Sequence, residues 1–123
     1  MTTPAHPPSD YAEFALTMLE WLESREELPE TVDDALELLA DRRRRLFLAV
    51  MDDYGESITL PDAAEEVAKR EAGQPVAELS AKEVANVYIS LYHDHLPRLV
   101  GADLVEYNQD RDLVSPGPLR NAE

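Results

Sequence analysis

The hydrophobic and polar positions between residues 80 and 114 form the clearest pattern in the chain. Ser80 and Glu83 have the S-x-x-E spacing of a capping box, which predicts that a helix starts there. Apolar residues then recur at helical spacing as far as Leu99, which predicts a long helix with one buried face. After Gly101 the pattern becomes extended, and it predicts two strands, 104–107 and 112–114, around a turn.

Weaker patterns upstream predict three more helices and a short extended segment. Asp10 with Glu13 marks the start of the first helix. The helices are expected at 11–25, 32–54 and 61–71, and the extended segment at 58–60. Apart from the N-terminal helix, the long helix is the third, and a hairpin follows it directly. This order predicts a mainly α fold with a small β-hairpin wing, a winged helix-turn-helix with an extra N-terminal helix. The expected organisation is a disordered N-terminus (1–9), an N-terminal amphipathic helix (10–28), the winged helix-turn-helix domain (30–115) and a flexible tail (116–123).

The charge balance adds an expectation about the environment. The chain has 26 acidic residues against 11 Lys and Arg, a formal charge of −15, and the acids are dispersed over every segment. Such self-repulsion destabilises a small domain in dilute buffer, whereas molar salt screens it. An acidic partner for a basic protein would instead concentrate its acids in one block. The dispersion therefore favours adaptation to a high-salt cell.

Two motifs resemble a known family. Residues 87–99 read V-Y-I-S-L-Y-H-D-H-L-P-R-L and are followed by L-V-E-Y, and residues 39–45 are similar to an L-x-D/N-x-R-R-R motif. Together they resemble a haloarchaeal winged-helix family of the ArsR/MarR-like type, whose members are labelled domains of unknown function or transcriptional regulators. The resemblance covers roughly residues 31–115. Relatives commonly carry Ala-Gly where this chain has Ala102-Asp103, and Asp tolerates the left-handed backbone such a bend needs.

The predicted long helix carries the candidate DNA-reading residues. In a helical projection, its apolar face lies opposite Lys82, Glu83, Asn86, Ser90 and His93. In a DNA-binding helix-turn-helix this outward arc enters the major groove, where Asn can pair with adenine and Lys can reach guanine or phosphate. The candidate base contacts are Lys82, Asn86, Ser90 and His93. A solvated helix face would show the same pattern, and that alternative stays open.

Four consecutive arginines, Arg42 to Arg45, form the one basic cluster. Arg43 falls on the apolar stripe and is expected to be partly buried and bound to backbone or acids. Arg42, Arg44 and Arg45, together with Arg111 in the predicted wing, are candidate phosphate contacts. Around the long helix and the wing, acidic side chains outnumber basic ones. This is only weak evidence against DNA binding, because in molar salt the neutralisation of phosphates contributes little to affinity.

The N-terminal helix carries apolar side chains that need a covering surface. Phe14, Met18, Trp21 and Leu22 are candidates for a homodimer interface, which would place two recognition helices on successive half-sites. Alternatively, these side chains cover the domain's own core.

Several classes of function have no support in the sequence. The chain has no cysteine, and His93 and His95 are two residues apart on a helix, so they cannot share one metal ion. We expect a buried, hydrogen-bonded His95, no metal site, no cofactor and no enzymatic activity. No apolar run reaches the length of a membrane span and no signal peptide is recognisable, so we expect a cytoplasmic protein with no membrane partner.

The expected function is sequence-specific binding of double-stranded DNA as a transcriptional regulator, in the form of a homodimer. The alternative is a winged-helix interaction module that dimerises or docks a protein partner and never touches DNA.

Overall fold

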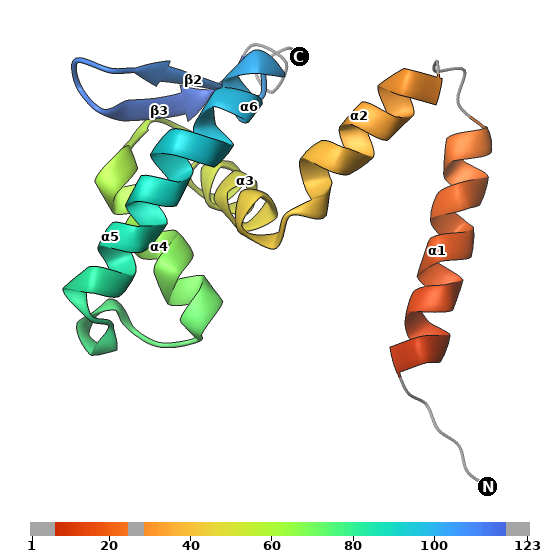
Figure 1. Ribbon diagram of the computed structural model, residues 1–123, viewed down its shortest axis with the longest axis horizontal. Helices are drawn as coiled ribbons and strands as arrows, with labels where there is room; N and C mark the ends of the chain where they lie inside the picture. Colours follow the sequence, from red (N-terminus) through yellow and green to blue (C-terminus); the bar gives the residue numbers. More distant parts are fainter. Residues whose placement is uncertain (1–6, 25–28, 118–123) are drawn as a thin grey trace, which may run out of the picture. The chain divides into compact units, whose positions relative to one another are not determined.

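The computed structural model describes residues 7–24 and 29–117 (Figure 1). The chain divides into two compact units, Met1–Leu36 and Glu37–Glu123, and each is considered by itself. The helices are α1 (Pro7–Glu23), α2 (Pro29–Ala40), α3 (Arg42–Tyr54), α4 (Leu60–Ala72), α5 (Ala81–Ser90) and α6 (Leu96–Gly101). The strands are β1 (Ile58–Thr59), β2 (Val105–Asn108) and β3 (Leu113–Pro116), so the mainly helical fold with a small β-hairpin is confirmed.

The first helix starts earlier than its sequence signal indicated. Helix α1 begins at Pro7, and proline is well suited to the first turn of a helix because it lacks only an N–H that would be unpaired there. Residues 7–9, expected within a disordered N-terminus, therefore form the beginning of α1. The rest of that expectation, at residues 1–6, lies outside the described residues, as do residues 25–28 at the expected end of this helix.

The single helix predicted over residues 32–54 is wrong, because Asp41 divides it into α2 and α3. Asp41 has an extended backbone (φ −83°, ψ 126°), and its carboxylate accepts a hydrogen bond from the Arg44 N–H at 3.0 Å. It is thus the N-cap of α3. An aspartate side chain competes in this way for backbone donors that a continuous helix would pair internally.

The core lies within the second unit, where α4 packs against both α3 and α5 (Figure 1). Helix α3 contributes the largest buried side chains, Phe47 and Met51. Helix α4 presents mostly small residues to the same core, which lets its backbone approach both neighbours. The fully or nearly fully buried apolar residues are Phe47, Val50, Met51, Ile58, Leu60, Ala63, Ala64, Val67, Ala68, Val87, Leu91, Leu96, Leu99, Val105 and Val114.

The three strands form one antiparallel sheet in the order β1-β3-β2. Val114 of β3 lies opposite Ile58 on one side and Tyr107 on the other. The short strand β1 therefore joins the hairpin β2-β3 to the start of α4, where the Leu60 N–H donates to the Asp112 carbonyl at 2.8 Å. Helices α3, α4 and α5 with this sheet form a helical domain with a small β-hairpin, as the sequence predicted.

The predicted long helix is present but is not regular throughout. Between α5 and α6, residues Leu91–His95 form one π-helical turn, η2, in which the Leu96 N–H bonds to the Leu91 carbonyl. Pro97 follows directly. Because proline has no N–H and its ring clashes with the carbonyl four residues earlier, a local widening of the helix accommodates it.

The helix ends in the left-handed conformation expected at Asp103, whose φ is 63°. The Leu104 N–H donates to the Leu99 carbonyl and the Asp103 N–H donates to the Val100 carbonyl, each at 3.0 Å. These two bonds form a Schellman motif, which satisfies carbonyls that a helix end leaves unpaired.

The expected flexible tail at residues 116–123 is wrong at its beginning. Strand β3 extends through Pro116, and Gly117 is buried, with its N–H donating to the Leu104 carbonyl at 3.0 Å. Residues 118–123 lie outside the described residues.

Candidate nucleic-acid interface

The start of α5 is fixed by the predicted capping box. The Ser80 hydroxyl accepts the Glu83 N–H at 3.0 Å, and the Glu83 carboxylate accepts the Ser80 N–H at 2.8 Å. This reciprocal pair satisfies two donors at the helix N-terminus. It therefore fixes which residues of the following turns face outward.

The outward face of α5 agrees in part with the sequence projection. Lys82, Asn86 and His93 are exposed, as predicted. Ser90 is half-buried and lines a polar hollow with Arg42 and Arg43, so it lies at the edge of the face.

Sequence reasoning missed two apolar residues on the outward face, Ala85 and Ile89, both of which are exposed. The same helical projection places Ile89 next to Lys82, on the side away from Asn86, so the signal was present in the sequence. His93 lies within the π turn, so its angle to Asn86 departs from regular α-helical spacing.

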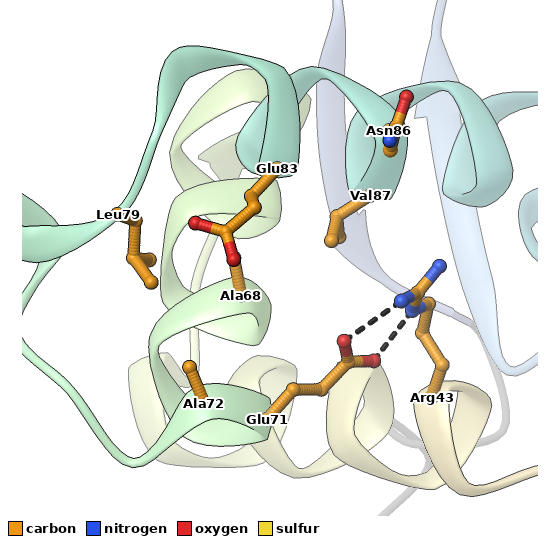
Figure 2. A pocket seen from close by; sticks show the side chains of 8 residues that line it. All are labelled: Arg43, Ala68, Glu71, Ala72, Leu79, Glu83, Asn86 and Val87. Carbon is orange, nitrogen blue, oxygen red and sulfur yellow. Dashed lines mark hydrogen bonds and ion pairs between the residues drawn. The ribbon is translucent and has the colours of Figure 1, made fainter.

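Arg43 has the structural role predicted for it. Its guanidinium binds the Glu71 carboxylate through two nitrogens, at 2.5 and 2.7 Å, which joins the start of α3 to the end of α4 (Figure 2). The hydrogen bond to Glu71 raises the pKa of Arg43 above its usual value. The pair borders a hollow of about 330 Å³ beside α5, and the Asn86 amide points away from the ion pair (Figure 2).

Arg44 is not available to DNA, so its assignment as a phosphate contact is wrong. Its side chain is buried, with 6% of its surface exposed. The guanidinium donates to the carbonyls of Leu38 at 2.8 Å and Glu37 at 3.4 Å, and to His95 Nδ1 at 3.2 Å. A guanidinium with these partners inside the fold cannot also reach a phosphate.

Arg45 also binds the end of α2, from the surface side. Its Nη1 donates to the Leu39 and Ala40 carbonyls at 2.7 and 2.9 Å. The last four carbonyls of α2, which the helix itself leaves unpaired, are thus all bonded by two arginines of α3. Arg45 retains other nitrogens for a phosphate, and the exposed Arg42 has no ion pair within residues 29–117.

His95 is the buried, hydrogen-bonded histidine that the sequence predicted. Only 3% of its surface is exposed, and its Nδ1 accepts the Arg44 Nε–H. Burial lowers the pKa of His95 below its usual value of 6.5, which outweighs the opposite effect of Asp41 and Asp94, each 3.8 Å from the ring. The ring is therefore neutral at pH 7, as its acceptor role requires.

The lowered pKa of His95 predicts a loss of stability in mild acid. Because the unfolded chain takes up this proton first, stability is complete above pH 6.5 and falls as the pH drops through the folded-state pKa, with a slope of up to about 1.4 kcal/mol per pH unit. The slope is measured by denaturant unfolding between pH 7.5 and 5.

The matched variant for this measurement is His95→Asn, which keeps an acceptor for Arg44 and should lose the slope. Hydrogen bonds lower the pKa values of Asp41 and Asp94 below 3.8, so these carboxylates act only at more acidic pH. An equal slope in both proteins between pH 6.5 and 5 would contradict the assignment.

The wing is held to α5 by Asp112. Its two carboxylate oxygens accept the Tyr88 hydroxyl at 2.7 Å and the Tyr107 hydroxyl at 2.6 Å. The bond to Asp112 raises the pKa of Tyr88, and burial together with the same carboxylate raises that of Tyr107. The candidate Arg111 is exposed in the hairpin turn, where its N–H donates to the Asn108 side chain at 3.1 Å.

An apolar hollow of about 610 Å³ lies between the second half of the long helix and β2. It is lined by Tyr92, His93, Leu96, Pro97, Val100, Gly101, Tyr107 and Gln109. The exposed Val100 at its border shows that this surface is not covered within the described part of the second unit.

The N-terminal candidates lie on α1. Phe14 and Trp21 are 65% and 55% exposed, whereas Met18 and Leu22 are half-buried. Tyr11, Leu16 and Leu19 of the same helix are exposed too. Helix α1 therefore has more apolar surface than the sequence stripe alone suggested.

Two further properties concern the described residues only. Within residues 7–24 and 29–117, no three His, Cys, Asp or Glu side chains lie close enough together to hold a metal ion. None of the helices in these ranges combines the length and the apolar composition needed to cross a membrane.

The described residues of the second unit form a small helical domain with a three-stranded antiparallel sheet, in which α5 has an exposed face. A family model described as a domain of unknown function (DUF7344) matches residues 36–115, and the chain belongs to that family. The matched range is close to the 31–115 of the resemblance. No curated protein and no solved structure matches the chain.

Proposed function

We propose that this protein binds double-stranded DNA as a transcriptional regulator and inserts α5 into the major groove. The observation that carries the proposal is the exposed face of α5, where Lys82 and Asn86 project from a capped helix next to a β-hairpin. The major groove of DNA is wide enough to admit an α-helix, whose outward side chains then reach the base edges.

The proposed contacts divide between bases and phosphates. Asn86 reads adenine, Lys82 reaches guanine or phosphate, and His93 extends the reading face at its C-terminal end. Ser90, at the edge of this face, is a permissive neighbour. The phosphate contacts are Arg111 in the hairpin turn and Arg42 and Arg45 at the start of α3.

The proposed setting is the cytoplasm of a salt-loving archaeon. The formal charge is −15 and just two of the 11 basic residues are lysines, Lys69 and Lys82. An affinity built on phosphate neutralisation is lost as salt increases, because counterion release then gains little free energy. A binder that works in molar salt depends instead on direct contacts with the bases.

The double variant Asn86→Ala, His93→Ala tests the reading face. We expect it to weaken binding to a selected duplex at molar KCl by roughly ten-fold or more, since one bidentate base contact contributes about 1–3 kcal/mol. Fluorescence anisotropy measures the affinity. Glu56→Ala, exposed in the loop before β1, is the control and should bind as the original protein does. An unchanged affinity of the double variant would refute this face.

We further propose that the protein is a homodimer through α1, with Phe14, Met18, Trp21 and Leu22 in the interface. Two of these side chains, Phe14 and Trp21, are aromatic and more than half exposed, which supports this proposal because large apolar surfaces are typical of interaction sites. A twofold dimer would also present two copies of α5 to successive half-sites.

Trp21→Glu is expected to convert the dimer to a monomer in sedimentation at molar salt, because it places a charge inside the apolar interface. Ala12→Glu adds the same charge at an exposed position on the opposite side of α1 and should leave the dimer intact. A Trp21→Glu protein that still sediments as a dimer contradicts this interface.

The second candidate function is that of an interaction module that docks a protein and does not bind DNA. The apolar hollow between Tyr92, Val100 and Tyr107 favours it, because an uncovered apolar surface can hold a partner's side chains. Capture of DNA from cells at their native salt separates the two. A set of sites with a shared twofold motif supports the regulator, whereas recovery of a protein without DNA supports the module.

A further inference from the structure

The outward face of α5 has an apolar side, Ile89 with Ala85, that the proposed polar contacts leave unused. Ile89 is 53% exposed, whereas Val87 and Leu91, two residues before and after it, are buried on the other side of the helix. It lies three residues after Asn86, four after the exposed Ala85 and four before His93. Residues at these spacings are neighbours on a helix surface, so Ile89 lies among the proposed base contacts.

An isoleucine suits one particular feature of the major groove. Its branched side chain has one strongly preferred χ1 rotamer in a helix, which fixes the position of its γ-methyl group. The edges of the bases in the major groove are polar except for the 5-methyl group of thymine. Ile89 therefore fits thymine among the four bases.

The same contact fits the electrostatics of the chain. An apolar contact involves no counterions, so salt that screens the Lys82 and Arg111 contacts leaves it in place. The acids Glu83, Asp94 and Asp110 are exposed near this face and the wing, and they add nothing to phosphate attraction. Apolar contacts such as that of Ile89 therefore contribute a larger share of the binding affinity at molar salt than at low salt.

We propose that Ile89 contacts the 5-methyl group of a thymine and that the DNA site contains this thymine near the adenine read by Asn86. This inference rests on the proposed DNA-binding function and specifies the class of sequence that the same face recognises. Ala85 makes room beside Ile89 for the methyl group, because its own side chain is small.

The test begins with a random duplex library, enriched on the full chain at molar KCl. Each thymine of an enriched duplex is then replaced by deoxyuridine, which removes only the 5-methyl group. Affinities are measured for the original protein, for Ile89→Ala and for Val100→Ala, a control that shortens an exposed apolar residue of α6. Thermal unfolding of each variant verifies the fold.

We expect deoxyuridine at one position to weaken the original protein and Val100→Ala by about four-fold, the effect of losing one buried methyl group. Ile89→Ala should bind the two duplexes equally, because the partner of the methyl group is gone. Equal binding of both duplexes by the original protein overturns the inference, and so does a four-fold effect that persists in Ile89→Ala. Failure to enrich any duplex overturns the proposed function itself and is seen before any thymine is replaced.

Discussion

Replacing Arg44 by Ala is expected to lower the free energy of unfolding by about 3 kcal/mol. The guanidinium is buried and donates to two carbonyls at the end of α2 and to His95. Its removal leaves these acceptors without donors inside the fold and leaves an empty volume between α3 and the long helix. Denaturant unfolding at molar KCl measures the loss.

The matched control is Arg42→Ala, two residues earlier in the same basic run. Arg42 is exposed, so its removal should change stability by less than about 0.5 kcal/mol. The same control has a second use, since Arg42 is a proposed phosphate contact and its loss should reduce the salt dependence of DNA binding. An Arg44→Ala protein as stable as Arg42→Ala would contradict the buried arrangement.

Replacing Gly117 by Ala is expected to destabilise the domain by about 2–3 kcal/mol. A Cβ at this position would meet Val105 N and Leu104 C at 2.7 Å each, and it would lie closer still to the Asp103 carbonyl oxygen. All three are backbone atoms, which cannot rotate away as a side-chain end can. The hairpin would have to move away from the bend that connects α6 to β2.

Gly101→Ala provides the comparison, because a Cβ there meets nothing within 4 Å and the backbone is helical. This variant should be unchanged or more stable by up to about 1 kcal/mol, the difference in helix propensity between the two residues. Thermal unfolding of both variants measures the contrast. Equal stability of the two would show that the chain after β3 does not pack against the bend.

Much of the fold was predictable because its signals are local. The capping box at Ser80, the helix opened by Pro61 and the change from helical to extended pattern after Gly101 all depend on residues within one or two turns. Arg43 was predicted to be partly buried and bonded to backbone or acids because of its place on the apolar stripe, and it binds Glu71. The left-handed bend at Asp103 was expected from the family resemblance, in which relatives carry glycine there.

The candidate site was predicted less completely. The exposed Lys82, Asn86 and His93 follow from helical periodicity, which a sequence shows directly. Arg44 was misassigned because four adjacent arginines have the same chemistry in sequence. Their different environments depend on α2 and on His95, which is 51 residues away along the chain.

The sequence by itself determined the order of the elements, the starts of α4 and α5, the buried face of the long helix and the acidic, cysteine-free composition. The cap at Asp41 that separates α2 from α3 is local as well, although the hydrophobic pattern predicted one helix there. Only the tertiary structure decided that Arg44 is buried and that Gly117 lies under the bend after α6. The physical reason is the range of the interactions. Capping and periodicity act between neighbours in the chain, whereas a donor's partner and the space beside a glycine depend on segments that only folding brings together.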